Sequence, residues 1–470
     1  MHPSPLVPIA LFGWLPLVVV SFTLLPPRRA VIGAFLVSWL FLPVYSYPVP
    51  GVLPDYTKMV ATTIGVLLGV LIFDSQRIFR FRPRWIDLPV LLWCLAPVPS
   101  ALDFGTGLQD GLSAATGKVF AWGLPFLIGR LYFSDWRTLR ELAIAIVVGG
   151  LIYVPLCLYE IRFSPQLNVQ VYGFHQHSFE QSFRGGGWRP VVFLDHGLMV
   201  GMWMATAAFL AYVLWRSRSL LRLGSVPMSA VAGGLLLTSL LVKSTGAFVL
   251  LLIGIAVYEW TRRIRSHLPL LIGLVVVPAT YLAVRATGLS DGQFLADIAA
   301  MFSTDRQGSM QFRIDSENLL LAKAHERPFF GWTPWAFSEV YDEFGNATSV
   351  VTDSLWIITL GQRGFLGLIA VFTTMLLPIV LVARRAWARR IGHPMVAPAF
   401  ALGIVLALYA VDNLVNAMVN PVYMLIAGGL CALRGAPSFA VGTVPEAAAA
   451  AVPTARPTLK TLKPRSPRHA

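Results

Sequence analysis

The feature that most constrains this chain is the recurrence of apolar runs, each close to the length that crosses a lipid bilayer. About 13 such segments occur, near residues 6–25, 30–46, 58–73, 87–101, 118–133, 139–159, 191–215, 226–242, 246–261, 267–284, 354–382, 396–411 and 421–434. A spanning helix needs about 20 apolar residues and satisfies its backbone hydrogen bonds internally. The pattern predicts an all-α polytopic membrane protein with about 12–13 transmembrane helices. The segment 87–101 is short enough to be re-entrant or tilted.

Composition agrees with a membrane protein, since 56% of the residues are hydrophobic and only 13% are charged. The strands of a membrane barrel would alternate in polarity, and these segments do not. Cys94, Cys157 and Cys431 lie far apart inside apolar runs, so they indicate packing and neither a disulfide framework nor a metal cluster.

Arginine collects in the loops that follow every second apolar segment. These loops contain residues 26–29, 77–84, 130–140, 215–222, 261–265 and 383–390. The positive-inside rule makes them cytoplasmic, and the net charge of +14 is then a topogenic signal. The sequence has no stretch in which basic and aromatic residues alternate as they do in nucleic-acid-binding proteins. We therefore expect no nucleic-acid partner.

The alternation also predicts where the remaining parts lie. Two long inserts, about 160–190 and 285–353, are expected on the outer side as large extracytoplasmic loops with short helices, with the amino terminus outside and the carboxyl end inside. Residues 1–435 are predicted to form a single transmembrane domain whose first span is retained. Residues 436–470, rich in Ala, Pro and Thr, are predicted to be a disordered basic cytoplasmic tail near anionic lipid.

Two motifs that suggest nucleotide or metal chemistry are rejected. The stretch GLSAATGKV (111–119) has five residues where a phosphate-binding loop has four, and Val119 where Ser or Thr should bind magnesium. His175 and His177 lack a spaced third ligand, and a polar loop touching headgroups or partners explains them. No metal and no cofactor are expected.

Two polar stretches of the outer side carry the candidate chemistry. In RGGGWRPVVFLDHGLMVG (184–201), we expect Pro190 to begin a helix, which places Arg189 and His196 on one face, two turns apart. A helix start beside a guanidinium suits a phosphate or diphosphate, whereas an arginine at a span end can also simply reach the headgroups.

The second stretch is FRIDSENLLLAKAHERPFFGW (312–332). A helix over 312–326 would end before Pro328, and an aromatic turn would follow around Gly331. Arg313 and Glu317 are four residues apart and are expected to pair as a surface salt bridge.

The order of these motifs resembles the O-antigen ligase/polymerase family over roughly residues 184–375. The resemblance is carried by Arg189-Pro190 with His196 downstream, by Arg313 followed by Pro328 and Gly331, and by RGFLGL (363–368). Two departures are evident. Asp353-Ser354 stands where ligases usually have a His, and Ser244-Thr245-Gly246 replaces Ser-Arg-Gly, with Lys243 as a substitute positive charge. The missing His favours polymerase over ligase.

The resemblance implies glycosyl transfer from a polyprenyl-diphosphate-linked oligosaccharide at the periplasmic face of the bacterial inner membrane, without metal or nucleotide. The acceptor would be a glycan or lipid A core, and membrane lipid and other polysaccharide-assembly proteins would be partners. On this interpretation Arg189 and Arg313 hold the diphosphate, with Arg184 and Lys243 in support. Asp353, His196 or, less suitably, the paired Glu317 would be the general base.

Two other classes remain open from the sequence. A transporter or flippase would bind the same lipid-linked oligosaccharide without making bonds, but it should have related halves and charges at mid-membrane. The main mid-membrane exception here is Asp412-Asn413. A scaffold or sensor of an envelope complex would use the long outer loops as docking surface.

Overall fold

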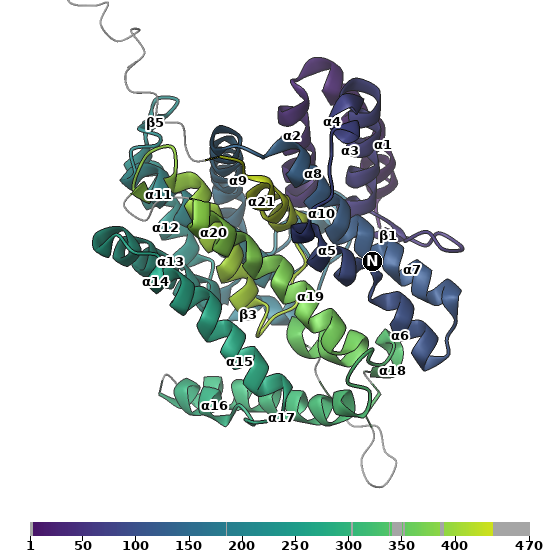
Figure 1. Ribbon diagram of the computed structural model, residues 1–470. Helices are drawn as coiled ribbons and strands as arrows, with labels where there is room; N and C mark the ends of the chain where they lie inside the picture. Colours follow the sequence, from purple (N-terminus) through teal and green to yellow (C-terminus); the bar gives the residue numbers. More distant parts are fainter. Residues whose placement is uncertain are drawn as a thin grey trace, which may run out of the picture. The chain divides into compact units, whose positions relative to one another are not determined.

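The computed structural model describes residues 3–184, 186–301, 304–337, 339–340, 350, 353–385 and 390–435. These residues are mostly helical (Figure 1). The tail predicted for residues 436–470 lies outside them.

Seven helical runs of the described chain are long and apolar enough to cross a membrane. They are α1 (Leu6–Leu24), the turn Trp85–Asp87 with α5 (Leu88–Leu95) and α6 (Pro97–Phe104), α7 (Leu108–Lys118) with the π-turn Val119–Gly123 and α8 (Leu124–Tyr132), α9 (Trp136–Phe163), α11 (Gly197–Arg216), α14 (Leu268–Leu271) with the π-turn Ile272–Val276 and α15 (Val277–Ala286), and α19 (Leu355–Arg385).

Four shorter apolar helices accompany them: α3 (Lys58–Phe73), α12 (Met228–Leu241), α20 (Ala397–Asp412) and α21 (Pro421–Ala432). The other helices are α2 (Pro27–Phe41), α4 (Ser75–Phe79), α10 (Leu167–Tyr172), the turn Phe179–Ser182, α13 (Thr245–Ile264), α16 (Gln293–Ala300), α17 (Thr304–Glu326) and α18 (Pro334–Phe337). Each predicted apolar segment overlaps one of these runs. The segment at 87–101 belongs to a run of 20 residues, long enough to cross.

Three short antiparallel hairpins of the described chain, each with two residues per strand, lie in loops between helices. Their strands are β1 (Ser46–Tyr47) with β2 (Tyr56–Thr57), β3 (Phe183–Arg184) with β4 (Gly187–Trp188), and β5 (Arg222–Leu223) with β6 (Val226–Pro227).

The core is centred on α11, which packs against α9, α12, α13 and α20. Small residues permit this crowding, because Gly150 of α9 lies so close to Ala207 of α11 that an added Cβ would be 2.3 Å from the Ala207 Cβ. By contrast α1 exposes large apolar side chains, with Ile9 65% and Leu17 61% exposed. An exposed apolar surface of this kind is what a helix facing lipid presents.

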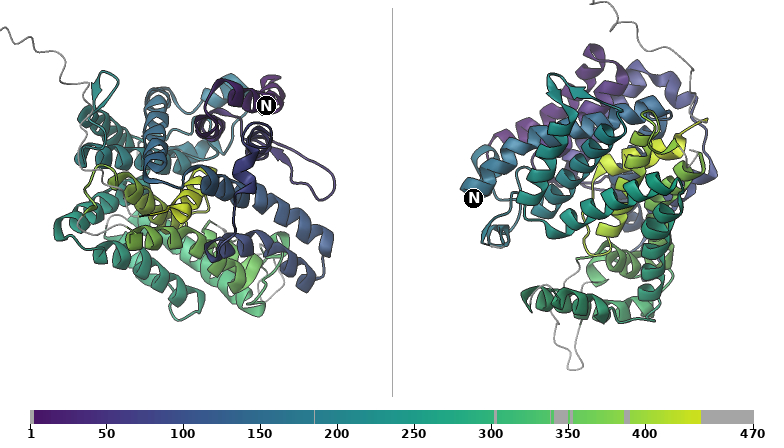
Figure 2. Two further views of the ribbon diagram at one scale, coloured as in Figure 1. Left: turned by 45° about the horizontal axis from the view of Figure 1, so that its top comes forward. Right: turned by 90° about the vertical axis from the view of Figure 1, so that its left-hand side faces the viewer.

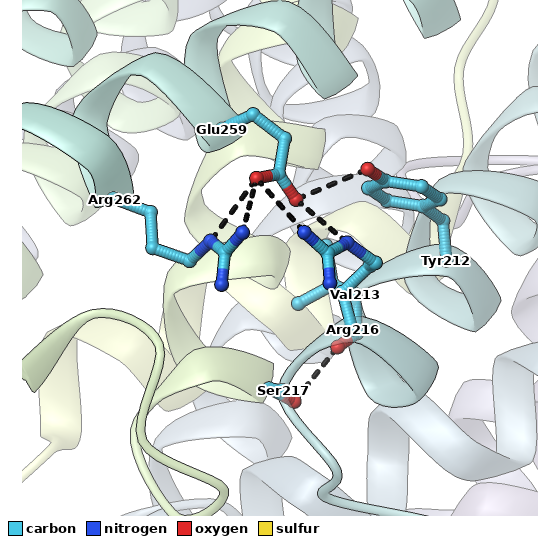
Figure 3. Close-up of polar contacts among 6 residues, drawn as sticks. All are labelled: Tyr212, Val213, Arg216, Ser217, Glu259 and Arg262. Carbon is cyan, nitrogen blue, oxygen red and sulfur yellow. Dashed lines mark hydrogen bonds and ion pairs between the residues drawn. The ribbon is translucent and has the colours of Figure 1, made fainter.

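The basic loops meet at one end of the described chain. Their contacts link one loop to the next: Arg28 with Glu141 (2.8 Å), Arg140 with Ser219 (3.0 Å), Arg77 with the Leu131 carbonyl (3.1 Å), and Arg216 and Arg262 with the shared carboxylate of Glu259 (Figure 3). The backbone N–H of Arg434 donates to the Ser134 carbonyl at this end as well.

The Arg-poor loops meet at the other end. There Arg313 donates to the Val415 carbonyl (3.3 Å), Thr116 to the Val52 carbonyl (2.6 Å), and Ser4 to the Tyr172 carbonyl (2.8 Å). Figure 1 has the β5 hairpin and α4 toward the top and α16 and α17 toward the bottom, and the right-hand view of Figure 2 agrees for the hairpin and for α16 and α17.

The two long inserts contain helices, as expected, but one of these helices is not short. The helix predicted over 312–326 begins already at Thr304 and has 23 residues, ending at Glu326 before Pro328. The first insert begins only after Phe163, where α9 ends.

A backbone joint fixes the end of α17 to α19. Gly364 interrupts α19 with φ 62° and ψ −165°, a conformation open essentially to glycine alone. The turn after Pro328 fills the break: Phe365 N–H donates to the Pro328 carbonyl (2.7 Å), and Trp332 N–H donates to the Gly361 carbonyl (2.6 Å). The turn from Pro328 to Gly331 and the stretch RGFLGL (363–368) are thus the two halves of one joint.

We expect Gly364→Ala to destabilise the protein by about 1–3 kcal/mol, because a strained φ/ψ of this kind is tolerated only without a Cβ. A Cβ at Gly364 would also lie 2.2 Å from the Phe329 carbonyl oxygen. Thermal unfolding of the detergent-purified protein measures the effect as a lowered midpoint. Gly233→Ala is the control, because a Cβ at Gly233 in α12 meets nothing within 4 Å. Equal midpoints for the two variants would contradict the joint.

Candidate functional site

The loop between α9 and α11 is folded around one buried carboxylate, that of Glu160, which is 1% exposed. Its Oε2 accepts the backbone N–H groups of Val191 and Val192 at 2.8 Å each, and its Oε1 accepts that of Leu167 at 3.0 Å. Val192 has a positive φ of 55°, so these bonds stabilise a strained turn. Glu160 thereby anchors the segment that carries Arg189 and His196 to α9.

The helix predicted to start at Pro190 starts instead at Gly197. His196 is its N-cap, and the His196 Nδ1 accepts the Leu198 N–H at 3.0 Å. Arg189 and His196 therefore do not share a helical face, and that prediction is wrong. They still come together, because the Arg189 side chain crosses Gly197 so closely that a Cβ there would be 2.4 Å from the Arg189 Cδ.

Helix α17 supplies the second arm of the site through Arg313. The Arg313 guanidinium forms an ion pair with Asp353 (3.2 Å) and donates to the Val415 carbonyl (3.3 Å). Asp353 lies two residues before α19, so this pair connects the outer helix to the start of an apolar span.

Glu317 does not pair with Arg313, contrary to the prediction. It pairs with Arg285 at the end of α15 (3.2 Å), and accepts from Ser354 Oγ (2.5 Å) and Trp356 Nε1 (3.2 Å). Arg285 is 1% exposed, which makes this a buried ion pair, and its Nη1 also donates to the Ser290 carbonyl (2.7 Å) and to Asn318 Oδ1 (3.0 Å). Glu317 therefore fixes α17 to α15 and α19, and it lines a small pocket with Arg313 and Asp353 that is separate from the larger cavity described next.

A cavity of about 460 Å³ brings most of the predicted site residues together. It is lined by His177, Gln181, Arg184, Arg189, His196, Leu198, Phe312, Arg313, Asp353, Asn416 and Met418. Lys243 lies behind this lining: its Nζ donates to the Arg184 carbonyl and its own carbonyl accepts from Arg189, both at 3.4 Å. Lys243 thus supports the two arginine segments by holding their backbone and side chain.

The cavity is strongly positive. Its lining contains three arginines and two histidines but one carboxylate, that of Asp353. Burial lowers the pKa of Arg189 to about 10, and Arg184 and Arg313 add to the shift. Arg189 nevertheless stays protonated at neutral pH. Three guanidinium groups around one small cavity suit a ligand with more than one negative charge, such as a diphosphate.

His196 is neutral in this environment. Burial and, to a smaller extent, His177 and the three arginines together lower its pKa to about 4. Because Nδ1 accepts the capping N–H, the proton of the neutral ring sits on Nε2. The imidazole can then donate a hydrogen bond from Nε2, and it can take up a proton only by releasing the cap.

The sequence patterns missed three residues of this region. Glu160 could have been found, because a carboxylate inside an apolar segment is rare without a partner. His177 was assigned only to a polar loop, but its ring centroid lies 4.6 Å from that of His196 and it lines the cavity. Arg285 stands at the end of an apolar run, and nothing in the spacing points to Glu317.

Within the described ranges, no group of three His, Cys, Asp or Glu side chains is arranged to hold a metal ion. No protein-family model matches the chain, and no curated protein sequence matches it.

Proposed function

We propose that the protein is a membrane glycosyltransferase that uses a polyprenyl-diphosphate-linked oligosaccharide, most plausibly a polymerase of O-antigen or exopolysaccharide repeat units. The observation that carries the proposal is the convergence of Arg189 and Arg313, far apart in sequence, on one cavity that also contains His196 and Asp353. The resemblance of residues 184–375 to the O-antigen ligase/polymerase family favours the same function.

The grouping of the loops supports a periplasmic site. If the arginine-rich end is cytoplasmic by the positive-inside rule, the cavity opens on the opposite side of the inner membrane of a bacterium. With about 13 spans the amino terminus then lies outside, and Ser4, bonded to Tyr172 among the Arg-poor loops, is consistent with this.

The proposed reaction needs no oxidant and no nucleotide. An acceptor hydroxyl attacks the anomeric carbon of the donor sugar, a glycosidic bond forms, and the bond from that carbon to the diphosphate oxygen breaks. Polyprenyl diphosphate departs with the bonding electron pair, and the hydroxyl proton passes to a base. Arg189 and Arg313, with Arg184 beside them, stabilise the charge that develops on the leaving diphosphate.

Asp353 is the better candidate for the base. It is the one carboxylate in the lining, whereas the neutral His196 already uses Nδ1 as an acceptor. The Nε2–H of His196 suits hydrogen bonding to the donor instead. Arg313 pairs with Asp353 at 3.2 Å, so a bound diphosphate that draws the guanidinium toward itself would leave the carboxylate free to accept the hydroxyl proton.

The test is transfer by the purified protein in lipid vesicles that contain a polyprenyl-diphosphate-linked repeat unit. A polymerase lengthens the glycan on the carrier, whereas an O-antigen ligase moves glycan to lipid A core or protein. A flippase moves the donor across the bilayer and makes no bond. Absence of any new glycosidic bond with every acceptor would overturn the proposed function.

We expect Gly197→Ala to slow transfer about 10- to 100-fold, because the added Cβ displaces Arg189 by about 1 Å from its place in the cavity. The rate per inserted protein measures the effect. Gly234→Ala, in open space on α12, should transfer at the parental rate. A parental rate for both variants would show that the position of Arg189 does not matter.

A further inference from the structure

A second arginine-rich cavity, of about 260 Å³, lies at the basic end. Six arginines line it: Arg77, Arg80, Arg82, Arg84, Arg130 and Arg434. They come from three segments distant in sequence, namely α4 with the turn after it, the end of α8, and the residues after α21. The positive-inside rule requires only that arginines lie on one side of the membrane. It does not explain why six of them surround one cavity.

Carboxylates compensate only part of this charge. Asp74 binds Arg77 (2.9 Å) and accepts from the Tyr132 hydroxyl (2.9 Å). Asp87 binds Arg130 and accepts the Arg84 N–H (2.8 Å). Two acidic groups thus face six guanidinium groups, and the lining keeps a positive charge.

Other arginines of the same end are neutralised differently. Figure 3 shows Arg216 and Arg262 sharing the carboxylate of Glu259, which also accepts from the Tyr212 hydroxyl at 3.0 Å. This end of the fold can therefore pair its arginines internally, whereas in the second cavity only Arg77 and Arg130 of the six arginines have a carboxylate partner among the described residues.

Arg130 is the buried arginine of the lining and is 8% exposed. Its Nη1 binds Asp87 and its Nη2 donates to the Arg82 carbonyl at 3.5 Å, so the guanidinium is held in place at the wall of the cavity. An anion with several oxygens is the ligand that several arginine forks would bind together.

We propose that this cavity binds the phosphate group of an anionic ligand. The ligand is either an anionic phospholipid headgroup or a water-soluble phosphate. Beside the arginines, Phe79 is 83% and Trp85 is 63% exposed. Exposed aromatic side chains next to arginines are typical of the membrane interface, which favours the phospholipid. The proposal does not depend on the proposed function.

The experiment uses the full-length protein in nanodiscs of neutral phosphatidylcholine. Native mass spectrometry measures binding of soluble short-chain phosphatidylglycerol in one arm and of inorganic phosphate in the other. We expect the parental protein to bind one of these two probes. The double variant Arg82→Ala/Arg84→Ala should bind the same probe at least about tenfold more weakly, because charge-assisted hydrogen bonds from arginine to phosphate are strong. Preference for phosphatidylglycerol identifies the headgroup, and equal or better binding of phosphate identifies a soluble ligand.

Two further variants keep the test decisive. Arg222→Ala/Arg263→Ala removes two exposed arginines of the same end that do not line the cavity, and it should bind like the parent. Arg82→Lys/Arg84→Lys keeps both positive charges, so it should bind more tightly than the double alanine variant. A variant that has lost affinity because it is misfolded would not show this recovery. Binding of neither probe by the parent, or equal loss in both alanine variants, would overturn the proposal.

Discussion

Arg313→Ala and Arg189→Ala proteins are each expected to transfer sugar about 10²–10³-fold more slowly than the parent, the size of effect seen when one donor to a developing negative charge is removed. Both guanidinium groups line the same cavity, and Lys243 does not take the place of either, because its Nζ donates to the Arg184 carbonyl. Lysine at either position keeps a charge but loses the planar fork, so it should restore only part of the rate. Initial rates of glycan transfer at fixed protein in the membrane measure the loss.

The matched control is Arg162→Ala. Arg162 ends α9 near the same face, is exposed, and does not line the cavity. A combined Arg189→Ala/Arg313→Ala protein adds a sharper test, because two groups that hold one diphosphate act as a unit and their effects are not additive. If the combined loss equals the product of the single losses, the two arginines do not share a ligand.

Asp353→Asn is expected to lower kcat about 10²–10⁴-fold with a smaller effect on KM, as for loss of a general base. Asparagine keeps the size of the side chain and can still accept a hydrogen bond from Arg313, so binding should be largely retained. His196→Asn should have a smaller effect, about 10- to 100-fold, because the amide oxygen can still cap α11 and only the Nε2–H is lost. A larger loss for His196→Asn than for Asp353→Asn would reverse the two roles.

The pH dependence provides an independent check on His196. Its pKa is lowered to about 4 in the fold from an ordinary value of 6.5. Between these values the unfolded chain binds more protons than the folded protein, so stability falls as pH decreases from about 6.5 toward 4. The thermal midpoint of the parent should drop over this interval more steeply than that of His196→Asn. Above pH 6.5 the two curves should run parallel.

Much of the fold is predictable because a membrane leaves few options for an apolar segment. Each predicted apolar segment overlaps a helical run of the described chain, and seven of these runs are long and apolar enough to cross a membrane. The end of α17 before Pro328 and the turn at Gly331 were also predictable, since proline and glycine act through local backbone geometry.

The errors arose where partners come from another segment. Spacing within a helix pairs Glu317 with Arg313, whereas the fold brings Arg285 to Glu317 from α15. Likewise Pro190 is suited to a helix start, but Glu160 on a distant helix holds the N–H groups of Val191 and Val192 in a turn and delays the start to Gly197. Neither partner is visible from a local pattern.

The joint at Gly364 also restricts how the cavity can open. It ties the carboxyl end of α17 to α19 through backbone hydrogen bonds and through the Ser100 hydroxyl, which is bonded to the Trp332 and Gln362 carbonyls, so exchange of the exposed Phe329 side chain should leave it intact. Glu317 fixes α17 to α15 and α19 at a second place, through Arg285, Ser354 and Trp356. Because α17 is held at both places, Arg313 is preorganised beside Asp353 at the start of α19.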